Sequence, residues 1–176
     1  MADVSVREQA GERAAVPLLC LLAALGIGLA SWQLIERERE LAGWAALGAG
    51  VCLVAAGVLL QPGDRRARVV LSFADRAFDG CILGALAWTT RTSQPAIAAA
   101  ALVALAAGFV ASYIRAKGGS LGYGIEEGVV TPVLRYGLVS AALLLDWTAW
   151  AIWVVAGLML LAAGVRASQV AKEERL

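Results

Sequence analysis

Runs of about 20 apolar residues recur along almost the whole chain, and this is the feature that most limits how it can fold. A helix of about 20 residues is long enough to cross a hydrocarbon layer of roughly 30 Å. Of the 176 residues, 60% are hydrophobic and 16% are charged, whereas soluble domains have about 45–50% apolar and about 25% charged residues. The sequence therefore predicts an all-α, polytopic membrane protein.

Charged segments and proline- or glycine-containing turns divide the chain into six predicted transmembrane helices. We expect residues 1–13 to form an N-terminal cytoplasmic segment, residues 14–165 to form the six-helix membrane domain, and residues 166–176 to form a cytoplasmic tail. The first apolar run is too long for the core of a signal peptide, so it is expected to remain as a span. The predicted spans cover residues 14–35, 41–60, 69–90, 96–113, 129–145 and 147–165.

The placement of lysine and arginine predicts the orientation of these spans. Six spans put both termini on the same side, and cytoplasmic segments of membrane proteins carry an excess of positive residues. The tails and the connections after the second and fourth spans hold most of the positive charge, so both termini are predicted to be cytoplasmic. On the opposite side, tryptophans near the span ends are typical of an interfacial belt: Trp32, Trp44, Trp88, Trp147 and Trp150.

The rarer residue types exclude several kinds of site. The chain has no histidine, which removes histidine-based catalytic triads, histidine metal sites and imidazole proton relays. The three cysteines, Cys20, Cys52 and Cys81, all lie in apolar segments and lack the paired spacing of a disulfide framework or a zinc site. Membrane lipids are expected partners, and no nucleic acid is expected to bind.

Residues 73–88, FADRAFDGCILGALAW, place charge at the mouth of the third predicted span. Asp75 and Asp79 are four residues apart and share a helical face, and Arg76 is three residues before Asp79. Ionisable residues in a membrane helix indicate a functional site by default. Carboxylates suit a hard divalent cation, although two of them alone make a weak site. The alternative is that Arg76 simply neutralises Asp79.

Three basic residues are predicted to lie at the same level of the membrane. Arg115 and Lys117 end the fourth span, and Arg135 is expected about two turns inside the fifth. Together they suit a phosphate, because arginine binds it with a bidentate fork and lysine acts as a point charge. The alternative is that Arg115 and Lys117 extend to anionic lipid headgroups.

The motif ADRAFDGCILGALAW followed by SYIRAKGGSLG resembles the CDP-alcohol phosphatidyltransferase family. It is most similar to the bacterial branch of phosphatidylinositol-phosphate and phosphatidylglycerol-phosphate synthases. The resemblance covers residues 69–138, and the six-span layout extends it to the whole chain. It implies a dimeric protein of the bacterial plasma membrane, related to enzymes that transfer a phosphatidyl group from CDP-diacylglycerol to an alcohol and release CMP.

The resemblance implies a site in which four aspartates hold two divalent metals over the pyrophosphate of CDP-diacylglycerol. The last of these aspartates also acts as general base. Asp75 takes this last place, but Gly50, Leu53 and Leu71 stand in the other three. Asp79 matches an accompanying acid that is not a metal ligand. No metal site is therefore intact, and Mg²⁺ or Mn²⁺ is expected as a cofactor only if the chain is active.

The acceptor side of the family's site is better retained. By the resemblance, Arg115 and Lys117 match the basic residues after the fourth span, and Arg135 aligns with an arginine of the fifth. The second basic run is here TPVLR, residues 131–135, so part of that pocket is missing. These three residues are predicted to bind an acceptor phosphate or a lipid headgroup.

Two functions from different classes follow. In the first, the chain is a pseudoenzyme of phospholipid biosynthesis that pairs with or regulates an active synthase, as a homodimer or a heterodimer with an active paralogue, or that binds lipid or anions. In the second, it is an active phosphatidyltransferase that uses Asp75, Asp79 and carboxylates borrowed from a partner chain, with a phosphorylated polyol such as inositol phosphate or glycerol phosphate as acceptor. A third reading, a membrane scaffold or small transporter, does not account for the motif pair.

Overall fold

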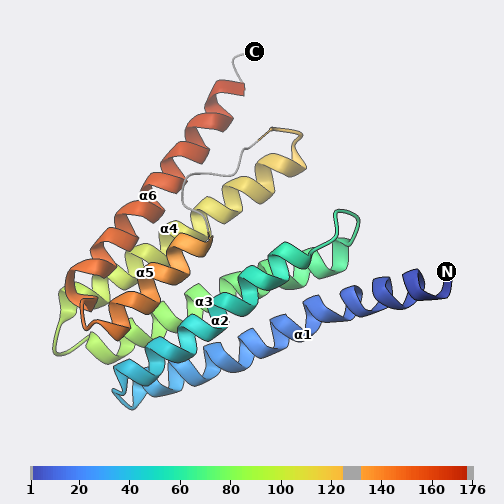
Figure 1. The fold of residues 1–176 in the computed structure, drawn as a ribbon. Helices are drawn as coiled ribbons and strands as arrows, with labels where there is room; N and C mark the ends of the chain where they lie inside the picture. The colour runs from blue at the N-terminus through green and yellow to red at the C-terminus, as the bar shows by residue number, and fades with distance from the viewer. Residues whose placement is uncertain (1, 125–131, 174–176) are drawn as a thin grey trace.

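The computed structural model describes the backbone of residues 2–124 and 132–173 and the side chains of residues 15–124 and 132–172. The described residues fold into helices joined by turns (Figure 1), as the all-α prediction requires. The helices are α1 (Ala2–Ile35), α2 (Arg39–Leu59), α3 (Arg65–Thr90), α4 (Pro95–Ser120), α5 (Pro132–Leu144) and α6 (Thr148–Glu173). The residues predicted as a separate N-terminal segment and tail largely continue α1 and α6.

Four of these helices are long and apolar enough to cross a membrane, as judged by length and composition: Ala15–Ile35, Arg39–Leu59, Pro95–Ser120 and Thr148–Lys172. Helix α3 has 26 residues but is more polar, and α5 is a shorter apolar helix of 13 residues. Large apolar side chains are exposed along the outside of the bundle, including the tryptophans at the predicted span ends. This is the make-up of a membrane protein.

Local sequence signals explain where several helices begin and end. Asp64 caps α3 by accepting a hydrogen bond from the backbone N–H of Ala67 at 2.9 Å. Pro95 and Pro132 occupy the first positions of α4 and α5, where a missing N–H does no harm. Helix α4 ends at Ser120, and Gly122, two residues later, turns the chain with a φ of 88° that glycine readily adopts.

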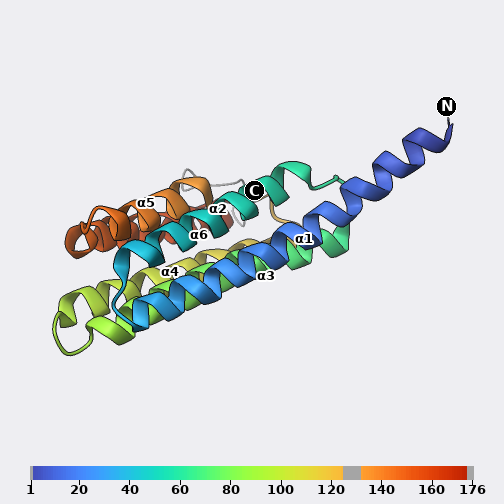
Figure 2. The same ribbon diagram turned by 60° about the horizontal axis from the view of Figure 1, so that its bottom comes forward.

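The helices form two layers. One layer contains α1, α3 and α4 and the other contains α2, α5 and α6, with contacts between α1 and α2 and between α4 and α6 joining them (Figure 2). The turns α1–α2, α3–α4 and α5–α6 lie together at the lower left of Figure 1. From there α1, α2 and α3 extend to the right, whereas α4 and α6 extend upward.

Small residues line the helix contacts and let the backbones approach closely. Alanines such as Ala23, Ala46 and Ala100 are fully buried. On α2, a methyl group added at Gly43 would stand 2.7 Å from the Cγ atom of Leu144, and one added at Gly50 would stand 2.9 Å from the Cβ atom of Tyr136. Helices α2 and α5 therefore approach one another at two glycines, and this positions the side chains of α5 for the site below.

Candidate functional site

The candidate site is a group of charged side chains buried between α3, α4 and α5. Asp75 and Asp79 lie on one face of α3, as their spacing predicts. The side chain of Asp79 is 4% exposed and that of Asp75 is 18% exposed. Arg135 of α5 reaches the same place and is 6% exposed. We call Asp75, Arg76, Asp79, Arg135 and Tyr136 the charge cluster.

Two guanidinium groups each bridge both aspartates. Arg76 donates from Nη2 and Nε to Asp75 Oδ2, the Nε distance being 3.2 Å, and its Nη1 lies 3.1 Å from Asp79 Oδ2. Arg135 donates from Nη2 to Asp75 Oδ1, and its Nε lies 2.8 Å from Asp79 Oδ1. Every oxygen of the two carboxylates therefore faces a guanidinium nitrogen.

The two contacts to Asp79 are charge contacts rather than aligned hydrogen bonds, because Asp79 Oδ2 and Arg135 Nε have no hydrogen-bond partner of good geometry. The cluster holds two formal negative and two formal positive charges, so it is neutral as a whole. Burying a charge is costly unless it is paired. Mutual neutralisation is what allows such side chains to lie inside an apolar bundle.

Neutral groups complete the cluster. The hydroxyl of Tyr136 donates to Asp75 Oδ1, and the Tyr136 ring packs on Phe78 with 4.5 Å between ring centroids. Arg76 Nη1 also donates to the backbone oxygen of Gly108 in α4, at 3.1 Å. A side chain at residue 108 would point at this contact, since a methyl group there would stand 3.5 Å from Arg76 Nη1.

The arrangement does not resemble a metal centre. Among residues 15–124 and 132–172, whose side chains the structure describes, no three histidine, cysteine, aspartate or glutamate side chains come together in a way that could hold a metal ion. The three positions at which the resemblance predicts further aspartates hold residues that pack within the bundle. Gly50 lies against Tyr136, Leu53 is buried in the core, and Leu71 packs partly buried against it.

The predicted anion-binding residues do not all lie together. Arg135 is in the first turn of α5 as described from Pro132, and residues 129–131, which begin the predicted fifth span, lie outside the described residues. It contacts the aspartates of α3. Arg115 and Lys117 are exposed in the last turns of α4, and Arg115 is seven residues, or about 10 Å, further along that helix than Gly108. Residue 131 of the TPVLR run lies outside the described residues.

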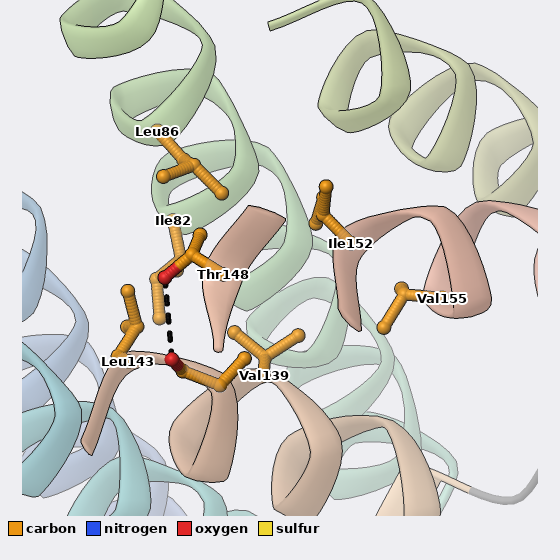
Figure 3. Close-up of a pocket in the computed structure, with 8 residues that line it drawn as sticks. Ile82, Leu86, Val139, Leu143, Thr148, Ile152 and Val155 are labelled. Atoms are coloured by element: carbon orange, nitrogen blue, oxygen red, sulfur yellow. Dashed lines mark hydrogen bonds between the residues drawn. The ribbon is translucent and has the colours of Figure 1, made fainter. Parts of the chain in front are cut away.

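Beyond the cluster, a small apolar cavity lies where α3, α5 and α6 meet (Figure 3). Its volume is about 10 Å³, which is at the lower limit for one water molecule. The polar group beside it is the Thr148 hydroxyl, which donates to the backbone oxygen of Ala142 at 3.2 Å. A cavity of this size and lining has no room for a substrate. It is lined by Ile82, Leu86, Val139, Ala142, Leu143, Thr148, Ile152 and Val155.

Two contributors to the cluster were missed from the sequence. The backbone oxygen of Gly108 gives no sequence signal. Tyr136 does give one, because a tyrosine next to an arginine inside an apolar helix is a second polar group that needs a partner when buried.

No model of a known protein family matches the sequence, and no curated protein is significantly similar to it. The family that the two motifs resemble therefore remains a prediction.

Proposed function

We propose that this chain is a non-catalytic, six-span membrane protein with the architecture of the CDP-alcohol phosphatidyltransferases, acting in phospholipid biosynthesis as a partner or regulator of an active synthase. One observation carries the non-catalytic part. Asp75, the residue in the place of the general base, has both carboxylate oxygens engaged by Arg76, Arg135 and Tyr136.

The chemistry of phosphatidyl transfer explains why this observation matters. Divalent metals stabilise the leaving nucleotide and clamp the phosphates, and a carboxylate takes the proton of the attacking hydroxyl. A carboxylate that neutralises two guanidinium groups is a poor proton acceptor. With apolar residues at the remaining signature positions, the charge cluster acts as a structural replacement for the family's metal site.

The acceptor side supports the same proposal. Arg135 is directed to the aspartates, so a phosphorylated acceptor would have to compete with two carboxylates for it. Arg115 and Lys117 are exposed at the end of α4. They would serve to contact anionic lipid headgroups, which attract basic residues next to a membrane.

The proposed topology has α3 and α5 crossing the membrane with the other four helices and both termini in the cytoplasm. It is supported by the basic residues at the start of α3, Arg65, Arg66 and Arg68, and at the ends of α4 and α6, Lys117 and Lys172. An excess of positive residues on one side is the pattern of cytoplasmic segments. The partner role rests on the resemblance, since the family's enzymes are dimers.

The decisive experiment is a CMP-release assay on the purified protein with radiolabelled CDP-diacylglycerol, Mg²⁺ or Mn²⁺, and a panel of phosphorylated alcohols. We expect no release above background, with an active synthase of the family as the positive control. Release that is abolished by Asp75→Ala would replace this proposal with the active-enzyme reading.

The partner role needs a separate test. An affinity-tagged chain purified from its native membrane in mild detergent is expected to retain an active phosphatidyltransferase, identified by mass spectrometry and by its CMP release. A chain that purifies without any such enzyme would contradict the partner role and leave the non-catalytic conclusion in place.

A further inference from the structure

Helix α3 is poorly suited to crossing a membrane by itself. Within five residues it carries Asp75, Arg76 and Asp79, so the middle of this helix has a formal charge of −1. Charged side chains deep in a bilayer are costly unless they pair or reach water. Of the long helices, α3 is also the one that does not qualify as a membrane span by its own length and composition.

Helix α5 has the opposite imbalance. Arg135 is the single charged residue in its 13 residues, which gives the helix a formal charge of +1. The two helices therefore complement one another, and the structure brings these charges together: Arg135 contacts both Asp75 and Asp79. The Asp79 and Arg135 side chains are 4% and 6% exposed, so each charge is neutralised by the other and not by contact with solvent.

The packing of α5 explains how it can deliver this charge. Helix α5 packs along α2 and α6, two helices that are each apolar enough to cross a membrane by themselves. It packs tightly against α2 at Gly43 and Gly50, where an added methyl group would clash with Leu144 and Tyr136. Helix α5 is thus fixed by apolar neighbours while its first turn directs Arg135 and Tyr136 toward α3.

We propose that α3 is retained in the membrane by Arg135 of α5, because the formal charge of +1 on α5 balances the formal charge of −1 on α3. Removing Arg135 leaves α3 with an unbalanced negative charge, which favours states in which α3 leaves the bilayer. Removing Asp79 as well makes the middle of α3 neutral by itself, because Asp75 and Arg76 then balance one another. This inference rests on the six-span topology of the proposed function, but not on the absence of catalysis.

Cys81 provides a native probe for this proposal. It is on α3, two residues beyond Asp79, and its side chain is exposed on the outside of the bundle, where lipid would surround it. In a Cys20→Ser, Cys52→Ser background it is the single thiol in the chain. A membrane-impermeant maleimide should label it in vesicles only when α3 is outside the hydrocarbon layer.

Four proteins in this background are compared: the parent, Arg135→Gln, Asp79→Asn, and the double variant. The parent is expected to be protected. Arg135→Gln should raise the initial labelling rate about tenfold or more, since an unbalanced charge on α3 opposes insertion. Asp79→Asn should stay near the parental rate, because Asp75 and Arg76 then balance within α3, and the double variant should return to near the parental rate for the same reason. Arg39→Gln, which loses an exposed ion pair to Asp146, is the matched control and should label like the parent.

Two results would overturn the proposal, and they differ in what else they affect. If Arg135→Gln labels at the parental rate, or if either variant that carries Asp79→Asn labels as fast as Arg135→Gln, charge balance does not hold α3, and the proposed function is untouched. If Cys81 of the parent labels readily, α3 is not a span. The inference then fails together with the six-span topology, while the CMP-release assay still decides catalysis.

Discussion

Gly50 of α2 lies directly against Tyr136 of α5, so that a methyl group at residue 50 would stand 2.9 Å from the Cβ atom of Tyr136 and 3.2 Å from its Cγ atom. Tyr136 in turn donates its hydroxyl to Asp75. The position at which the resemblance expects the first metal-binding aspartate thus serves to bring two helices together. Its glycine lets α5 come close enough for Arg135 and Tyr136 to reach α3.

Gly50→Ala is therefore expected to destabilise the protein. The added methyl group has no space unless α2 and α5 move apart, and overpacking of this kind costs about 1–3 kcal/mol. The unfolding midpoint in mild detergent, followed by circular dichroism, should fall. The control is Gly48→Ala on the same helix, where no atom lies within 4 Å of the added methyl group. Equal midpoints for the two variants would show that the α2–α5 contact is not tight.

Asp79→Ala is expected to be more damaging. It removes one partner from both guanidinium groups and leaves a net positive charge in a buried place, and breaking a buried ion pair in this way costs about 3–5 kcal/mol. The readout is the fraction of protein that stays monodisperse by size-exclusion chromatography after heating.

The matched control for Asp79 is Asp146→Asn, which breaks the ion pair with Arg39 and keeps a residue type that tolerates the φ of 52° at this position. The side chains of Asp146 and Arg39 are 75% and 41% exposed, and exposed pairs contribute about 0–1 kcal/mol. If Asp146→Asn were as damaging as Asp79→Ala, burial would not be what makes the cluster important to stability.

Tyr136→Phe distinguishes the contribution of the Tyr136 hydroxyl to stability from that of its ring. The variant keeps the packing on Phe78 but loses the hydrogen bond to the Asp75 carboxylate, and hydrogen bonds to charged groups contribute about 1.5–3 kcal/mol. Tyr136→Leu should lower the unfolding midpoint further, because it also loses an aromatic contact of about 0.5–1.5 kcal/mol. An unchanged midpoint for Tyr136→Phe would mean that Arg76 and Arg135 satisfy Asp75 without it.

The helices themselves could be predicted from the sequence because hydrophobicity is a local property. Turn signals such as the proline and glycine at residues 62 and 63 separate α2 from α3 as expected. The helical spacing of Asp75 and Asp79 predicted that they share one face. The alternative that Arg76 neutralises Asp79 agrees with the 3.1 Å contact between Arg76 Nη1 and Asp79 Oδ2. These are relations within a few residues of one helix.

The position of Arg135 could not be predicted in the same way. It is 56 residues after Asp79 in the sequence, and their contact depends on which helices are neighbours. Alanine and glycine on several faces of these helices leave many packings open. From the sequence, Arg135 was predicted to bind a phosphate together with Arg115 and Lys117. In the folded chain Arg135 contacts the carboxylates of Asp75 and Asp79 instead. Opposite charges attract strongly where water is scarce.

The last prediction concerns divalent cations. Because every carboxylate oxygen of Asp75 and Asp79 faces a guanidinium nitrogen, Mn²⁺ could bind at the charge cluster only by displacing an arginine. Adding Mn²⁺, or removing metal with EDTA, should leave the unfolding midpoint unchanged. A site filled at about 100 times its dissociation constant would add about 2.7 kcal/mol, which is readily measured. An active synthase of the family is the positive control, and stabilisation of the present chain by Mn²⁺ would favour the active-enzyme reading.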